Sequence, residues 1–232
     1  LYEDDDEEEQ SVQPATNDYV TLKFKSRNGT GTFSSFSSTI QGWTLPTAPA
    51  APTLGTATAT TIATSWSAPA GGASNYKVYM DAGDATPTTL RTTQSGTTYT
   101  QTGLTSNTQY YFRLKSEGGG GDLSAFGAVS NKYTNVGAPS SLQTDEYGNT
   151  TIDVEWTASP GGTPTLYQVK WGTNGIAFPN SGNTANGSTT SFQLTSLTQN
   201  TQYYIKVRAY SSNNSGNYSS YSNTLTQTTR DR

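Results

Sequence analysis

Large apolar residues alternate with small or polar residues in many short stretches of the chain. Apolar or β-branched side chains fall at every second position in residues 62–66, and residues 110–114 and 203–207 repeat this pattern. A period of two predicts β-strands that bury one face. Clusters of Gly, Asn, Ser and Asp, as in residues 117–122 and 213–217, predict turns between the strands. The chain is therefore predicted to be all-β.

The chain repeats itself at an offset of about 90 residues. Residues 104–115 match residues 197–208 at an offset of 93. Upstream, residues 62–69 match residues 152–160, and each segment is followed by a Gly-Gly pair and then a Tyr-x-Val strand. Many short strands with regular turns are typical of a β-sandwich, and 232 residues suit two domains of this size.

These motifs together resemble the fibronectin type III family, whose strands are lettered A to G. In that family a Trp ends strand B, a Tyr-x-Val strand C follows, and a Leu-x-Pro-x-Thr-x-Tyr corner enters strand F. Here the corner reads 104–110 and 197–203, with Ser106 and Gln199 where the family usually has Pro. The resemblance spans residues 47 to 230 and implies tandem immunoglobulin-like β-sandwiches in an extended array. It also implies a structural core that contains Trp66, Tyr76, Leu104, Tyr110, Trp156, Tyr167, Leu197 and Tyr203.

The first 45 residues carry a third, partial copy of the repeat. Residues 18–26 align with residues 108–116 at an offset of 90, residues 33–40 align with residues 218–225, and residues 12–16 resemble the corner. Strands F and G of a domain are therefore predicted without strands A, B and C. The large apolar side chains of this copy are the candidate interface residues Val20, Leu22, Phe24, Phe33 and Phe36.

A strand pair with such an apolar face is not stable by itself. Each Val, Leu or Phe side chain gains about 1.5–3 kcal/mol on burial, and a two-stranded sheet is marginal in water. Residues 12–45 are therefore predicted to complete a sandwich or sheet with segments from elsewhere, either upstream sequence or a neighbouring subunit, by strand addition. A fold in which they pack only on residues 47–137 would contradict this expectation.

Proline-rich joints separate the copies. Residues 44–52 contain three Pro, and residues 136–139 lie between the two complete copies. Because Pro fixes φ, these joints are expected to be short and semi-rigid. The predicted domains are an acidic N-terminal segment with the partial domain at 1–45, and complete domains at 46–136 and 137–232, arranged as a rod.

The sequence contains few of the residue types and motifs that enzymes use for catalysis. The chain has no Cys and no His, and its 13 Lys and Arg are scattered without a basic stretch in a chain of net charge −4. The commonest general base and metal ligand is therefore missing, and no Gly-x-Ser-x-Gly elbow occurs. We expect no enzymatic activity, cofactor or metal site, and no nucleic-acid binding. No stretch approaches 18 apolar residues, so membrane insertion is not expected either.

The most unusual local feature is the run of six acids from Asp4 to Glu9. It could be a solvated, self-repelling segment, a Ca²⁺ site, or a strand E of the partial domain. Because the run has no Gly turn and no spaced Asp-x-Asp pattern, the solvated segment is favoured.

Several aromatic residues are candidates for surface contact. Trp66 and Trp156 are expected in the core because they match the core Trp of the family. The candidates for surface contact are instead Trp43, Trp171, Tyr79, Tyr111, Tyr204 and Tyr210.

Two functions remain open from the sequence. The leading hypothesis is a non-catalytic structural or adhesive spacer on an extracellular assembly, such as a bacteriophage virion appendage or a bacterial surface structure. The alternative is an accessory linker or weak carbohydrate-binding region of a secreted polysaccharide-degrading enzyme. The predicted partners are other subunits of the assembly, joined by strand complementation through the N-terminal partial domain, and cell-surface glycans are further candidate ligands. The expected location is extracellular or on a virion surface.

Overall fold

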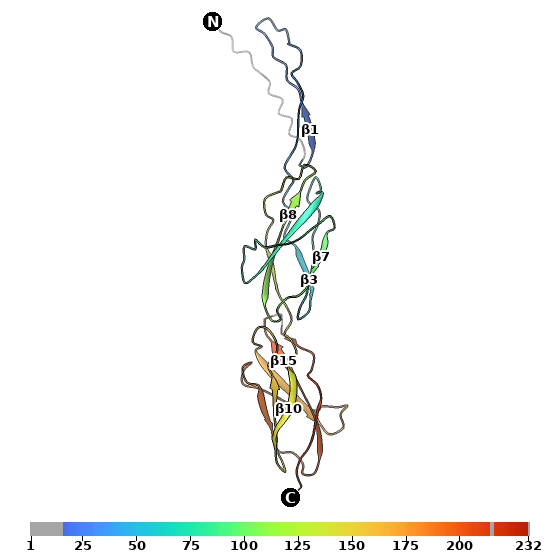
Figure 1. Ribbon diagram of the computed structural model, residues 1–232, viewed down its shortest axis with the longest axis vertical. Coiled ribbons are helices and arrows are strands. Elements are labelled where there is room, and N and C mark those ends of the chain that lie inside the picture. Colours follow the sequence, from blue (N-terminus) through green and yellow to red (C-terminus); the bar gives the residue numbers. More distant parts are fainter. Residues whose placement is uncertain (1–15, 214–215, 232) are drawn as a thin grey trace.

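The computed structural model describes residues 16–213 and 216–231, and these residues form 17 β-strands and no helix. Figure 1 shows an elongated molecule in which a hairpin and two sandwiches follow one another along the long axis. The predicted all-β tandem array is therefore confirmed. With no helix in the described part of the chain, none is present there that could cross a membrane.

The hairpin pairs β1 (Tyr19–Leu22) with β2 (Ile40–Trp43) in an antiparallel two-stranded sheet. The acidic run and residues 12–15 of the predicted corner lie outside the described residues.

The first sandwich packs a three-stranded sheet against a four-stranded sheet. The strand orders are β3–β4–β7 and β6–β5–β8–β9, with antiparallel neighbours throughout. The strands are β3 Thr53–Ala57, β4 Ile62–Ser65, β5 Asn75–Ala82, β6 Leu90–Gln94, β7 Thr98–Gln101, β8 Gln109–Glu117 and β9 Ser130–Tyr133.

The second sandwich repeats this arrangement. One sheet has the order β10–β11–β14, and in the other β13, β12 and β15 are neighbours while both β16 and β17 pair with β15. The strands are β10 Ser140–Tyr147, β11 Ile152–Thr157, β12 Leu166–Gly172, β13 Asn180–Asn183, β14 Ser191–Leu194, β15 Gln202–Ser211, β16 Asn217–Tyr218 and β17 Leu225–Thr228.

Each sandwich has its own core, formed by the alternate positions that the sequence pattern marks. Burial along β8 and β15 alternates residue by residue, so Phe112 and Ile205 are fully buried while their neighbours face outward. A Trp ring meets a Tyr ring edge to face in both cores, with centroids 5.5 Å apart for Trp66 and Tyr76 and 5.3 Å apart in the second copy. All eight residues assigned to the core from the sequence are buried.

The core packing predicts that the same change, Ile to Ala, has very different effects on stability at a buried and at an exposed position. Ile205→Ala removes a side chain with 0% exposure and should cost the second sandwich about 2–5 kcal/mol of unfolding free energy through lost burial and the cavity left behind. Ile176, on the β12–β13 loop, is 89% exposed, so Ile176→Ala should change stability by less than about 0.5 kcal/mol. Denaturant unfolding of the two variants measures the difference; equal effects would contradict the core assignment.

Candidate functional site

The hairpin reproduces the F–G strand pair of the first sandwich. In β1–β2, Tyr19 pairs with Trp43 and Leu22 with Ile40, and in β8–β9 every register pair lies 90 residues later. The turn repeats as well. The amide of Asn28 donates to the carbonyl of Thr32 at 3.0 Å, and 90 residues later the amide of Gly118 donates to the carbonyl of Asp122 at 2.9 Å. The described part of residues 1–45 is therefore a structural copy of strands F and G, as the sequence repeat predicts.

Among the residues that the structure describes, no second sheet covers the inward face of this hairpin, unlike its counterpart in the first sandwich. Leu22 and Phe24 are 45% and 57% exposed, whereas the equivalent Phe112 and Leu114 are fully buried. Ile40, which pairs with Leu22 and lies on the same face, is 58% exposed. Of the other candidate interface residues, Val20 is half-buried, and Phe33 and Phe36 are exposed. An apolar surface that the first sandwich buries is thus open at the N-terminal end of the rod.

The edge of β1 is open too. In the first sandwich, β8 pairs with β9 on one side and with β5 on the other. In the described residues β1 pairs with β2 alone. The hairpin therefore offers both a face and a strand edge to an incoming segment.

An asparagine in the left-handed region stands at the corner of each copy. Asn17, Asn107 and Asn200 have φ values of 61°, 50° and 48°. Asn tolerates this conformation better than most non-glycine residues. The corner is also fixed by its Tyr: the hydroxyl of Tyr110 accepts a hydrogen bond from the amide of Thr105 at 2.9 Å, and the second sandwich repeats this bond.

Asn107 joins the two sandwiches. Its Nδ2 donates to the carbonyls of Gly162 and Thr163 at 3.2 and 2.8 Å, and its Oδ1 accepts a hydrogen bond from the Ser211 hydroxyl at 2.7 Å. The Ser106 hydroxyl donates to the carbonyl of Pro160. Because these bonds reach both the β11–β12 loop and the end of β15, they fix the tilt of the second sandwich as well as its distance.

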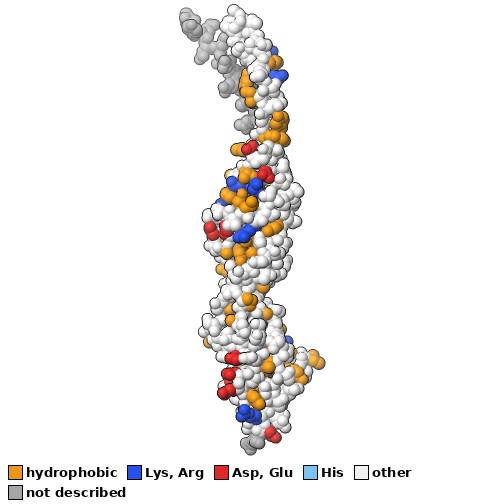
Figure 2. All heavy atoms as spheres, viewed as in Figure 1, with side chains coloured by type: hydrophobic (Ala, Val, Ile, Leu, Met, Phe, Trp, Pro, Cys, Tyr) orange, Lys and Arg blue, Asp and Glu red, His pale blue; other side chains and the backbone are white. Residues whose placement is uncertain are grey.

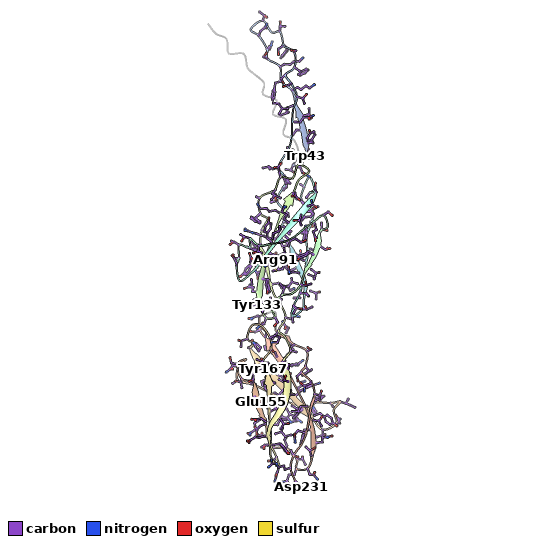
Figure 3. All side chains as sticks on the ribbon, viewed as in Figure 1. Trp43, Arg91, Tyr133, Glu155, Tyr167 and Asp231 are labelled. Carbon is purple, nitrogen blue, oxygen red and sulfur yellow. The ribbon has the colours of Figure 1, made fainter. Side chains whose placement is uncertain are left out.

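The same joint recurs between the hairpin and the first sandwich. The Asn17 side chain donates to the carbonyl of Gly71 at 3.3 Å and accepts from the amide of Gly119 at 2.9 Å, while the Thr16 hydroxyl donates to the carbonyl of Ala70 at 3.0 Å. Trp43 lies at this joint in Figure 3, over Gly119 and its neighbour, and its ring is 5.2 Å from the Tyr19 ring. Thr16 and Asn17 therefore have the roles at this joint that Ser106 and Asn107 have between the two sandwiches.

A glycine permits each close approach. Gly71 and Gly161 have φ values of 76° and 85°, and a Cβ at either position would overlap the corner residue of the preceding copy, Thr16 or Ser106. The Gly-Gly pair noted in the sequence therefore has a second role beyond its turn: it lets one copy dock on the next.

Most of the aromatic candidates are engaged within the molecule. Tyr79 meets Phe126 edge to face at 4.9 Å, Trp171 packs beside Phe192, and Tyr210 lies beside Tyr218. Tyr111 and Tyr204 are half-buried on the outward faces of β8 and β15. Trp43 is 42% exposed.

The expectation that Lys and Arg are scattered without a basic patch is wrong for the second sandwich. Lys170 and Lys206 are direct cross-strand partners, and Arg208 follows on the same face of β15. Residues far apart in sequence become neighbours because β12 and β15 pair. Burial lowers the pKa of Lys206, and the positive charges of Lys170 and Arg208 lower it further.

The first sandwich contains two ion pairs, Lys77 with Glu117 and Arg91 with Asp81. Asp81 accepts hydrogen bonds from the amides of Thr88 and Thr89 and lies 3.6 Å from Arg91. Burial raises the pKa of Asp81, but these bonds and the Arg91 charge outweigh that effect, so the net pKa is lowered. In the part of the chain that the structure describes, no three acidic side chains come together as a metal site.

Comparison with known proteins gives one family and a shared fold. The sequence model of the fibronectin type III domain matches residues 47–130 and 137–225. Among solved structures, a two-domain fibronectin type III segment of chicken tenascin is 20% identical with a TM-score of 0.55, and the match covers 78% of this chain and 99% of that one. The FN1–FN3 domains of chicken CNTN1 are 21% identical with a TM-score of 0.36, covering 91% and 78%. No curated protein matches.

The junction geometry predicts a specific effect of replacing the corner asparagine. Asn107→Gly keeps a residue that adopts positive φ but removes the hydrogen bonds to Gly162, Thr163 and Ser211. Asn200 has the same backbone conformation, is exposed and makes no side-chain hydrogen bond to the described residues, so Asn200→Gly is the matched control. Small-angle scattering should show a broader distribution of inter-domain angles for Asn107→Gly alone. Identical scattering of all three proteins would contradict the role of this joint.

Proposed function

The chain belongs to the fibronectin type III family, and we propose that it is a non-catalytic spacer on an extracellular assembly, such as a bacteriophage virion appendage or a bacterial surface structure. Tandem domains of this family indicate a structural or adhesive module, and they are commonly extracellular. The observation that carries the proposal is a two-stranded hairpin with an exposed apolar face at one end of a rod of two complete sandwiches.

The joints suit a spacer that holds its ends apart. Each joint combines side-chain hydrogen bonds from the corner with a glycine-permitted approach of the next copy. The first of them lies beside the Pro-rich residues 44–52, where backbone freedom is limited. A rod with restrained joints keeps its two ends at a defined separation and orientation, whereas a freely hinged chain would not.

The hairpin suits attachment by strand complementation. A partner that supplies the equivalents of strands A, B, C and E would pair with the open edge of β1 and cover Leu22, Phe24 and Ile40. Each of these side chains gains about 1.5–3 kcal/mol if it becomes fully buried. The partner is either sequence that precedes residue 1 or a segment of another subunit.

Locating the chain in its native source tests the proposed setting. Mass spectrometry of purified virions and of surface structures should find the chain in the particle fraction. Its recovery only as a soluble secreted protein joined to a catalytic domain would contradict the spacer proposal and favour the accessory role in a polysaccharide-degrading enzyme.

A pair of substitutions in β1 tests the attachment. Leu22→Asp puts a charge on the open apolar face, where its burial without a partner is costly, and should abolish incorporation of the chain into the assembly. Thr21→Asp makes a similar charge change on the opposite face of the same strand and should incorporate normally. Quantifying each variant in purified particles gives the result; equal incorporation of the two variants would contradict complementation through this face.

A further inference from the structure

The second sandwich separates its charges between its two sheets. The acidic residues of its strands all lie in β10 and β11: Asp145, Glu146, Asp153 and Glu155. The basic residues of its strands all lie in β12 and β15: Lys170, Lys206 and Arg208. Figure 2 shows acidic side chains along one side of this sandwich. Because the outward faces of two packed sheets point in opposite directions, the module has one acidic and one basic face.

The basic face is built from side chains that hold one another in place. Lys206 lies over the Phe178 and Tyr221 rings at 3.8 and 4.1 Å, and Arg208 lies over the Tyr218 ring at 3.7 Å. Nε and Nη2 of Arg208 both donate hydrogen bonds to Oε1 of Gln168. The cations are thus ordered by rings and an amide.

No carboxylate neutralises this face within the described residues. None of the ion pairs there involves Lys170, Lys206 or Arg208, and like charges that face each other across strands are unfavourable. The lowered pKa of Lys206 reflects its partial burial and this repulsion. A carboxylate supplied from outside would relieve the repulsion.

The first sandwich has cations at the matched positions, but it also has carboxylates on the same sheet. Arg113 and Lys115 precede Lys206 and Arg208 by 93 residues, and both lie over the Phe126 ring without an ion pair among the described residues. On the same sheet, however, Lys77 pairs with Glu117 at 3.2 Å and Arg91 pairs with Asp81. Its other sheet, β3–β4–β7, contains no charged residue. Only the second sandwich therefore presents complementary faces.

We propose that the basic β12–β15 face of one chain docks on the acidic β10–β11 face of a second copy. Asp153 and Glu155 alternate with buried residues along β11 and point outward, as do Lys206 and Arg208 along β15. The contact is heterologous, because each copy uses a different face, so copies can add side by side beyond a dimer. This association goes beyond the spacer function, and either proposal can fail without the other.

Residues 3–9 contain seven acids and are a second source of carboxylates. Docking of residues 3–9 on the basic face is an outcome of the test.

Sedimentation velocity of the full chain tests the proposal. At about 10 mM ionic strength, where the screening length is about 30 Å, the sedimentation coefficient should rise with concentration, and at about 1 M salt it should not. Lys206→Glu with Arg208→Glu should weaken association at least about tenfold by placing acid against acid. Asp153→Lys with Glu155→Lys should do the same from the other side. Mixing these two proteins, or combining all four changes in one chain, should restore association.

Two controls separate this contact from general charge effects. Arg113→Glu with Lys115→Glu changes net charge equally in the first sandwich and should leave association intact. Far-ultraviolet circular dichroism should show that every variant is folded. No association of the natural chain at low salt would overturn the proposal, as would failure of the charge swap to restore it. The acidic residues among residues 3–9 can also be changed to Asn and Gln. If this change abolishes association while Asp153→Lys with Glu155→Lys has no effect, the basic face binds the acidic run rather than β10–β11, and the proposal is overturned.

Discussion

A β-sheet with one apolar face must cover that face, and this requirement decides where the molecule is complete and where it is open. In both sandwiches it is met, since the inward positions of β8 and β15 are almost fully buried under a second sheet. In the hairpin it is not met, although its strands have the register and the turn of β8 and β9. The same local structure is therefore covered in one place and exposed in another, and the difference is the second sheet, which the described residues do not supply to the hairpin.

Each joint depends on an asparagine at the corner, which recurs in every copy of the repeat. The corner before strand F needs a residue with positive φ, and Asn meets that need while keeping a side chain that can reach the next copy. At Asn17 and Asn107 the side chain bridges to the following loops. A position required by the fold of one module thus also orients its neighbour, which is how a repeat of separate cores becomes one rod.

Much of the fold was predictable because its signals are local. Alternating burial, the Trp and Tyr of the core and the corner all recur in both complete copies, and the 90-residue offset was enough to place an equivalent of strand F in residues 18–26, of which Tyr19–Leu22 form β1. The joints were not predictable, because Asn107 and Gly162 are 55 residues apart and nothing local marks their contact. The basic face was missed for the same reason: Lys170 and Lys206 meet only through the pairing of β12 with β15.

The central claim is that the hairpin is half of a sandwich whose other half comes from elsewhere. Amide hydrogen exchange of residues 19–22 and 40–43, measured in the isolated chain and in the native assembly, tests it most directly. The account predicts rapid exchange in the isolated chain and, in the assembly, protection that approaches that of residues 109–117 in β8. Equal exchange of the hairpin amides in the two states would contradict it.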